Sequence, residues 1–80
     1  MRLDKYLKVS RLIKRRTIAN DACDAGRISV NGKVARASYD VKVGDVLEIR
    51  MGQHPVCVKV ESVSEHALKE DAKFMYTVVE

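Results

Sequence analysis

Basic side chains are concentrated at the start of the chain, and their type and spacing point most directly to a chemistry. Among the first sixteen residues they stand against a single acid, Asp4. The seven are Arg2, Lys5, Lys8, Arg11, Lys14, Arg15 and Arg16. Ammonium and guanidinium groups at this density suit contacts with the phosphates of a polyanion. The sequence therefore predicts a nucleic-acid-binding surface here, without choosing between RNA and DNA.

The alternative is that these cations form an ordinary solvated helix face, as most charge runs do. Two features favour binding. No second acid follows Asp4 until Asp21. In addition, the run of cations over residues 14–16 falls at the start of an expected helix, where the helix dipole disfavours positive charge. An anion bound there would meet free helix N–H groups as well as guanidinium groups.

Length and overall composition exclude several classes of protein. The chain has 80 residues and a net charge of +4, from 15 Lys and Arg against 11 Asp and Glu. Residues 1–40 hold ten basic and four acidic residues (+6), and residues 41–80 hold five and seven (−2). This length suits one small domain rather than a multidomain enzyme. With 5% aromatic residues and no Trp, a stacking platform for single-stranded RNA is not indicated.

No membrane span or secretory signal is expected, because the chain has no run of about 18 apolar residues and its start has no uninterrupted apolar segment. No catalytic or metal-binding set is evident either. His54 and His66 lie near no cysteine or carboxylate at the spacing of metal ligands. Cys23 and Cys57 form no Cys-x-x-Cys pair, and we interpret them as free, reduced, cytosolic thiols. We therefore expect a protein without catalytic residues, bound metal or cofactor.

Two short helices are expected to position the cations. The first covers residues 3–10, and residues 11–15 form a turn anchored by Leu12 and Ile13. Helical spacing sets its inward side as Leu3, Tyr6 and Leu7, and its outward side as Asp4, Lys5 and Lys8.

The second helix is expected over residues 16–25. No Ser or Thr caps its start, because Thr17 comes too late, and Gly26 follows it where a left-handed C-cap residue is needed. Its inward stripe is predicted as Ile18, Ala22 and Ala25, with Ala19 and Cys23 beside it and Asn20, Asp21 and Asp24 opposite. Leu3, Leu7, Ile18 and Ala22 are expected in the core.

Strands are expected in the rest of the chain. Ile28 to Val30 is followed by Asn31-Gly32, a strong signal for a tight hairpin, and Val34 begins the return. Alternation predicts further strands over residues 46–51 and 56–60, and less clearly over 75–79, with a helical turn within 65–73. The valines at 56, 58 and 60 are predicted to share one face. The fold class is therefore α+β, with two short N-terminal helices packed on a small, mostly antiparallel sheet.

Several of these segments together resemble the S4-type RNA-binding domain, also called the alpha-L motif. In chain order they are Arg2-Leu3-Asp4, Arg16 with Ala19, Ile28-Ser29-Val30-Asn31-Gly32, and Val43-Gly44-Asp45. Each segment alone is a weak signal, but their order and spacing make the set specific. The resemblance covers residues 1–52 as a core motif within a single domain, 1–80, and residues 53–80 fit the small extension of free-standing members.

Within that family, the run over residues 1–19 is similar to the RqcP-like branch, which acts in bacterial ribosome-associated quality control. The resemblance implies a non-catalytic, cytoplasmic and ribosome-associated factor that is a monomer when free. Such a factor would bind rRNA and peptidyl-tRNA on an obstructed large ribosomal subunit. It would support RqcH, which adds alanine tails to the stalled chain.

Carried over by position, the resemblance assigns RNA contacts to residues of the basic patch and the hairpin. Asp4 would either orient Arg2 or Arg16 through an ion pair or act as a simple acid at the helix start, and both readings stay open. The contacts are Arg2, Lys5, Arg11, Lys14, Arg15 and Arg16, with Asn31 and Lys33 as weaker candidates, and Lys8 joins them as a member of the basic cluster.

Two other functions remain open from the sequence. The same domain type is appended to pseudouridine synthases and tyrosyl-tRNA synthetases, so the chain could be an RNA-targeting module related to those enzymes. The sequence shows no catalytic carboxylate motif or nucleotide loop in support of this. A small basic structural or protein-interaction module is the third reading.

Overall fold

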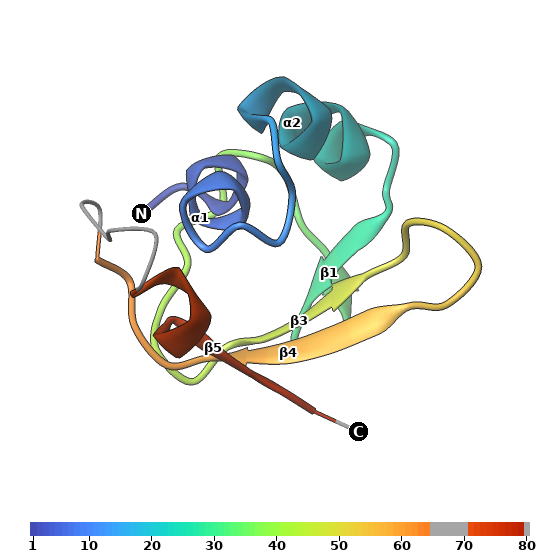
Figure 1. Ribbon diagram of the computed structural model, residues 1–80. Helices are drawn as coiled ribbons and strands as arrows, with labels where there is room; N and C mark the ends of the chain where they lie inside the picture. Colours follow the sequence, from blue (N-terminus) through green and yellow to red (C-terminus); the bar gives the residue numbers. More distant parts are fainter. Residues whose placement is uncertain (65–70, 80) are drawn as a thin grey trace.

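Two helices lie on one face of a five-stranded antiparallel sheet in the computed structural model, which describes residues 1–64 and 71–79 (Figure 1). This confirms the predicted α+β class. The sheet order is β2-β1-β3-β4-β5. The elements are α1 (Leu3–Val9), α2 (Arg16–Asp24), β1 (Ile28–Val30), β2 (Lys33–Val34), β3 (Val46–Ile49), β4 (Val56–Val60), the short 3₁₀ helix η1 (Ala72–Phe74) and β5 (Tyr76–Val78).

Helix α1 buries the side predicted for it, with one exception. Leu3, Tyr6 and Leu7 are fully buried. Asp4, predicted on the outward side, is also buried, with only 2% of its surface exposed. The wheel of α1 alone was misleading because α2 packs over this carboxylate and supplies polar partners for it.

Helix α2 is rotated relative to the prediction. The inward residues are Ala19, Ala22 and Cys23, whereas Ile18 is 43% exposed and Ala25 is exposed, so their predicted burial was wrong. A face of small side chains lets α2 approach α1 and the sheet more closely than a face centred on Ile would. The end of the helix is as predicted, since Gly26 follows with φ of +74°.

The β1–β2 hairpin has the predicted tight turn. Asn31 and Gly32 have φ of +52° and +86°, and left-handed conformation at both central residues is what a type I′ turn requires. The register pairs Val30 with Lys33 and Ser29 with Val34. On the other side β1 pairs with β3, so that Val30 meets Leu47.

The later strands differ from the prediction in detail. Strand β3 ends at Ile49, and Met51 packs against the core from beyond it. In β4, Val58 and Val60 are buried but Val56 is 42% exposed, because it lies at the end of the strand beyond the cover of the helices. Strand β5 confirms the last predicted strand. Of the helical turn predicted within 65–73, residues 65–70 lie outside the described part, as does His66.

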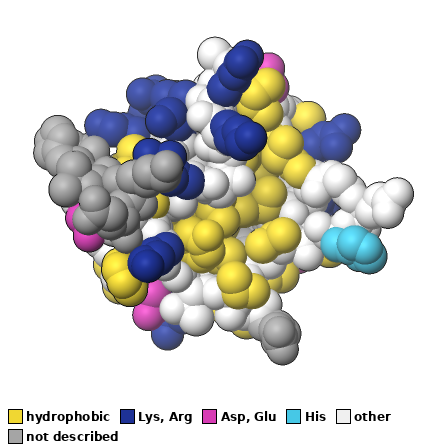
Figure 2. Space-filling view, in the orientation of Figure 1, with side chains coloured by type: hydrophobic (Ala, Val, Ile, Leu, Met, Phe, Trp, Pro, Cys, Tyr) yellow, Lys and Arg dark blue, Asp and Glu magenta, His cyan; other side chains and the backbone are white. Residues whose placement is uncertain are grey.

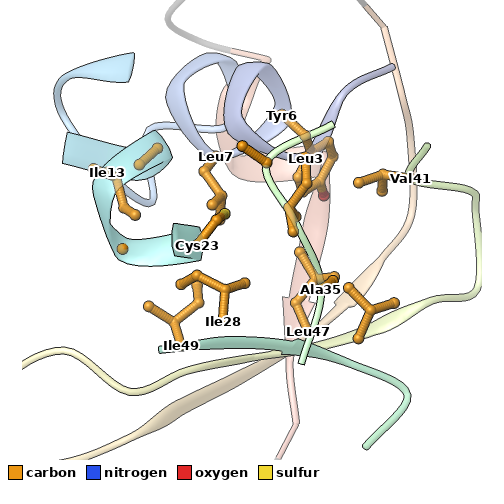
Figure 3. Packing of buried hydrophobic residues seen from close by; sticks show 14 of the residues in the cluster. Leu3, Tyr6, Leu7, Ile13, Cys23, Ile28, Ala35, Val41, Leu47 and Ile49 are labelled. Carbon is orange, nitrogen blue, oxygen red and sulfur yellow. The ribbon is translucent and has the colours of Figure 1, made fainter. Parts of the chain in front are cut away.

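Side chains from both layers meet in one hydrophobic core. Leu3 and Leu7 of α1 point toward Leu47 and Ile28 of the sheet (Figure 3), and the hydroxyl of the buried Tyr6 donates to the Met75 carbonyl. Burial of each such side chain contributes about 2 kcal/mol to stability. The core therefore fixes the inner side of α1 and leaves its polar side directed away from the sheet.

Candidate nucleic-acid interface

The predicted cations lie on the helical layer of the molecule. Figure 2 shows most of the Lys and Arg side chains of that face over the helices, whereas the sheet below is largely apolar and uncharged. Lys5 is half-buried, and the other six are exposed: Arg2, Lys8, Arg11, Lys14, Arg15 and Arg16. We call these seven residues the basic helical face.

Asp4 joins two of these cations. Its Oδ1 accepts hydrogen bonds from Arg2 Nε at 3.2 Å and from the Lys5 backbone N–H at 2.8 Å. Its Oδ2 accepts from Arg2 Nη2 at 3.4 Å, Arg16 Nε at 3.3 Å and Asn20 Nδ2 at 3.3 Å. Asp4 is thus an acid in the first turn of α1 and also pairs with both arginines.

The charge state of Asp4 follows from its surroundings. Burial opposes ionisation, but hydrogen bonds from Asn20, Arg16, Arg2 and the Lys5 N–H outweigh it and hold the pKa of Asp4 below its ordinary value. The carboxylate is therefore ionised at neutral pH, as is needed to hold two guanidinium groups near one another.

The two arginines keep donors available for a ligand. The Arg2 and Arg16 side chains are 52% and 49% exposed. Arg16 donates to Asp4 through Nε, and its two Nη groups have no partner among residues 1–64 and 71–79. A guanidinium fixed at one end and open at the other is suited to paired hydrogen bonds with phosphate oxygens.

Asn20 was predicted on the outward face of α2, but it is half-buried and donates to Asp4. It lines a small hollow with Asp4, Arg16, Thr17 and Asp21. The i, i+4 spacing from Arg16 to Asn20 was the available signal, since such residues are neighbours on a helix surface.

The loop between the helices brings more cations to the start of α2. Arg15 is the N-cap of α2, and its side chain makes no capping hydrogen bond, as the missing Ser or Thr predicted. Arg11 has φ of +65°, a left-handed conformation that turns the chain between the helices. The first turn of α2 thus presents backbone N–H groups beside exposed cations.

Asn31 is occupied by internal contacts. Its Nδ2 donates to Asp45 Oδ1 at 3.1 Å, and its Oδ1 accepts from the Val46 N–H at 2.9 Å. The side chain therefore ties the hairpin turn to the turn before β3. Lys33 is exposed, and its RNA contact stays a prediction.

Other candidate chemistry is weak in the described part of the chain. Cys23 is buried, and burial together with the nearby Asp4 and Asp24 raises the pKa of its thiol to about 11. Cys57 is half-buried and free, and His54 is exposed. Over residues 1–64 and 71–79, no three His, Cys, Asp or Glu side chains gather as a metal site would require. Within the same residues, no helix has the length and apolar character to cross a membrane.

The chain matches the S4 domain family over residues 1–47. The chain belongs to the S4 domain family. Two of its curated relatives are each called "RQC P-site tRNA stabilizing factor". The Bacillus subtilis protein is 57% identical over 79 residues, covering 99% of this chain and 92% of the relative. The Halalkalibacterium halodurans protein is 58% identical over 78 residues, covering 98% and 89%. The chain belongs to this RqcP-like branch.

A solved structure supports the same fold. The trimeric structure of Vibrio cholerae heat shock protein 15 superposes with a TM-score of 0.91 at 28% identity, covering 99% of this chain and 81% of that one. The family match includes α1, α2, the β1–β2 hairpin and the start of β3. Asp4 and every predicted RNA-contacting residue therefore lie within the S4 segment.

Proposed function

We propose that this S4 protein is a non-catalytic RNA-binding factor that stabilises tRNA on the large ribosomal subunit during ribosome-associated quality control. One observation carries the proposal: a buried carboxylate, Asp4, holds Arg2 and Arg16 together, and Arg2 Nη1 and both Arg16 Nη groups have no partner among residues 1–64 and 71–79. Such a guanidinium pair can form paired hydrogen bonds with phosphate oxygens. The names of the curated relatives point to the same activity.

The partners follow from the charge of the surface and from the family. The basic helical face would contact the phosphate backbones of tRNA and of rRNA in the large subunit. RqcH would add alanine to the stalled chain while this protein keeps the tRNA in place. We assign the RNA contacts to the basic helical face and to Lys33. Asn31 we assign to positioning, because both ends of its amide already have partners.

An RNA-targeting module of an enzyme is the less favoured alternative. The match covers 92% of the Bacillus subtilis relative, which leaves that relative little length for a catalytic domain. The function proposed here needs no chemical step, because holding RNA partners in place requires only binding energy.

Substitution of Arg16 by Ala tests the proposal. Loss of one charge-assisted phosphate contact should weaken binding to large subunits carrying tRNA by about tenfold. It should also lower the slope of log affinity against log salt by about 1. The matched control is Arg27→Ala, which removes an equally charged, exposed side chain beyond the other end of α2.

Sedimentation with purified subunits at several salt concentrations gives both quantities. At physiological salt we expect wild type and Arg27→Ala to sediment with large subunits, and a smaller fraction of Arg16→Ala to do so. Wild-type affinity that does not change with salt would refute phosphate binding. Equal losses for Arg16→Ala and Arg27→Ala would refute the assigned site, because only the total charge would then matter.

A further inference from the structure

An open groove of about 700 Å³ runs along the edge of the sheet beside the β1–β2 hairpin. Its walls include Lys33, Val34, Arg36, Ser38 and Tyr39, and we call it the hairpin groove. None of its lining residues is a carboxylate.

The hairpin groove is electropositive. Lys33 and Arg36 are exposed, and neither forms an ion pair within the described residues. One acid adjoins the groove: Asp45 accepts hydrogen bonds from Asn31 and from the Tyr39 hydroxyl, two of the lining residues. These bonds occupy both of its carboxylate oxygens. Lys33 and Arg36 outnumber this one acid and favour an anionic ligand.

The groove also has an apolar wall that is held in place. Val34 is 62% exposed, although it is a large aliphatic residue. Tyr39 is half-buried, its hydroxyl donates to Asp45 Oδ2 at 3.0 Å, and its carbonyl accepts from the Leu3 N–H at 2.8 Å. A ring held by its hydroxyl on an anchored backbone loses little entropy when a flat apolar surface packs against it.

Strand β2 adds open backbone groups. It is the edge strand, and it pairs Val34 with Ser29. The Ala35 N–H donates to the Ile28 carbonyl at 3.1 Å, so the alternation of antiparallel bonding directs the N–H and C=O of Val34 away from β1. The groove thus offers a donor and an acceptor beside an apolar wall, which is the combination that a base edge requires.

The groove adjoins the basic helical face. The segment that closes it is hydrogen-bonded to the start of α1, through Leu3 N–H to the Tyr39 carbonyl and Asp4 N–H to the Ala37 carbonyl at 3.2 Å. Arg2 forms a β-bridge with Asp40 in the same segment. An RNA backbone held at Arg2 therefore has the groove within reach.

We propose that the hairpin groove binds one unpaired nucleotide of the RNA whose backbone the basic helical face holds, an inference that rests on the proposed function. Lys33 and Arg36 would contact its phosphate, the base would pack on Val34 and Tyr39, and the Val34 backbone would bond its edge. Paired bases are stacked within a duplex and cannot enter, whereas an unpaired base can turn out and pack on side chains.

Two synthetic RNA hairpins test this, identical except that one carries a single unpaired 2-aminopurine in its stem. Fluorescence anisotropy measures affinity, and the 2-aminopurine emission reports on the environment of the base. The test variant is Val34→Glu, which places a carboxylate in the groove. The matched control is Val78→Glu on the opposite edge strand, where the valine is 59% exposed against 62% for Val34.

Wild type and Val78→Glu should bind the bulged RNA more tightly than the paired RNA and change its 2-aminopurine emission. Val34→Glu should lose that preference, because its affinity for the bulged RNA should fall by about tenfold, the effect of one lost base contact. Its affinity for the paired RNA should match that of Val78→Glu.

Equal wild-type affinity for the two RNAs would overturn the groove assignment and leave the proposed function standing. The groove assignment would also fail if Val34→Glu weakened binding to the bulged and the paired RNA equally, and by more than Val78→Glu does. The groove would then contact only the RNA backbone. If wild type bound neither RNA with a salt-dependent affinity, the proposed function itself would fail.

Discussion

Replacement of Asp4 by Asn would test the centre of the basic helical face. The Asp4 side chain is 3% exposed and accepts hydrogen bonds from Arg2, Arg16, Asn20 and the Lys5 N–H. Asn has almost the same shape, but its NH₂ group is a donor and would face donors that now share two carboxylate oxygens. The substitution therefore removes the negative charge and breaks part of the hydrogen bonding without leaving a cavity.

The expected loss of stability is about 2 kcal/mol at pH 7. Hydrogen bonds to a charged group contribute about 1.5–3 kcal/mol each when they are buried. Arg2 and Arg16 are half-exposed and can return to water, so each of their pairs with Asp4 contributes about 1 kcal/mol or less. The bonds from Asn20 and the Lys5 N–H survive in part, because the Asn oxygen still accepts.

The loss should depend on pH in a defined direction. Burial opposes ionisation of Asp4, but its hydrogen bonds outweigh burial and hold the folded-state pKa below the unfolded value of about 3.9. The ionised carboxylate therefore contributes stability above that unfolded value, and the contribution is lost as the pH falls through the folded pKa. The gap between wild type and Asp4→Asn should thus be constant from pH 7 to about 5 and should narrow as the pH falls below about 4.

Urea unfolding at a series of pH values measures this gap. Asp21→Asn is the matched control, because Asp21 is exposed in the same hollow and is not among the groups that bond Asp4. We also expect Asp4→Asn to weaken RNA binding, since Arg2 and Arg16 lose their shared anchor. A stability gap as wide at pH 3 as at pH 7, or an equal loss in Asp21→Asn, would show that the charge of Asp4 is not the cause.

Two further substitutions separate structural from RNA-contacting roles. Asn31→Ala should lower the free energy of unfolding by about 1 kcal/mol, because it removes the link to Asp45, and should change RNA affinity less than twofold. A large drop in affinity at unchanged stability would instead make Asn31 an RNA contact. Tyr6→Phe should cost about 1–2 kcal/mol in urea unfolding, because the buried Met75 carbonyl loses the hydroxyl that bonds it at 2.7 Å. No measurable destabilisation would mean that this carbonyl finds another donor.

The fold could be predicted well from local signals. Asn31-Gly32 fixed the hairpin, and alternation located β3 and β4, because turn chemistry and strand periodicity are encoded in neighbouring residues. The rotation of α2 could not be predicted in this way. Its apolar residues are mostly alanines, so the single large one, Ile18, dominated the predicted stripe, although the close approach of α1 depends on the small ones.

The candidate site was predicted by type of residue but not by geometry. The cations were evident from composition, and the family resemblance added Asp4. Which arginines Asp4 would hold depends on contacts between α1 and α2, as does the part taken by Asn20, and no local pattern encodes these. The hydrogen bond from Arg50 Nη2 to the Gly26 carbonyl at 2.7 Å, which fixes the end of α2 on the sheet, was likewise beyond local signals.

Strand β4 lies inside the sheet and not at its margin. It is paired with β3 through four residue pairs and with β5 through three. Val58 and Val60 in it are fully buried, yet the strand lies beyond the segment of S4 similarity. A fragment cut where the similarity ends would expose the core along a new sheet edge and would be prone to pair with other chains. The segment that would contact RNA is therefore shorter than the segment that must fold as a unit. A graft of this interface onto another protein needs the longer segment, which includes β4 and β5.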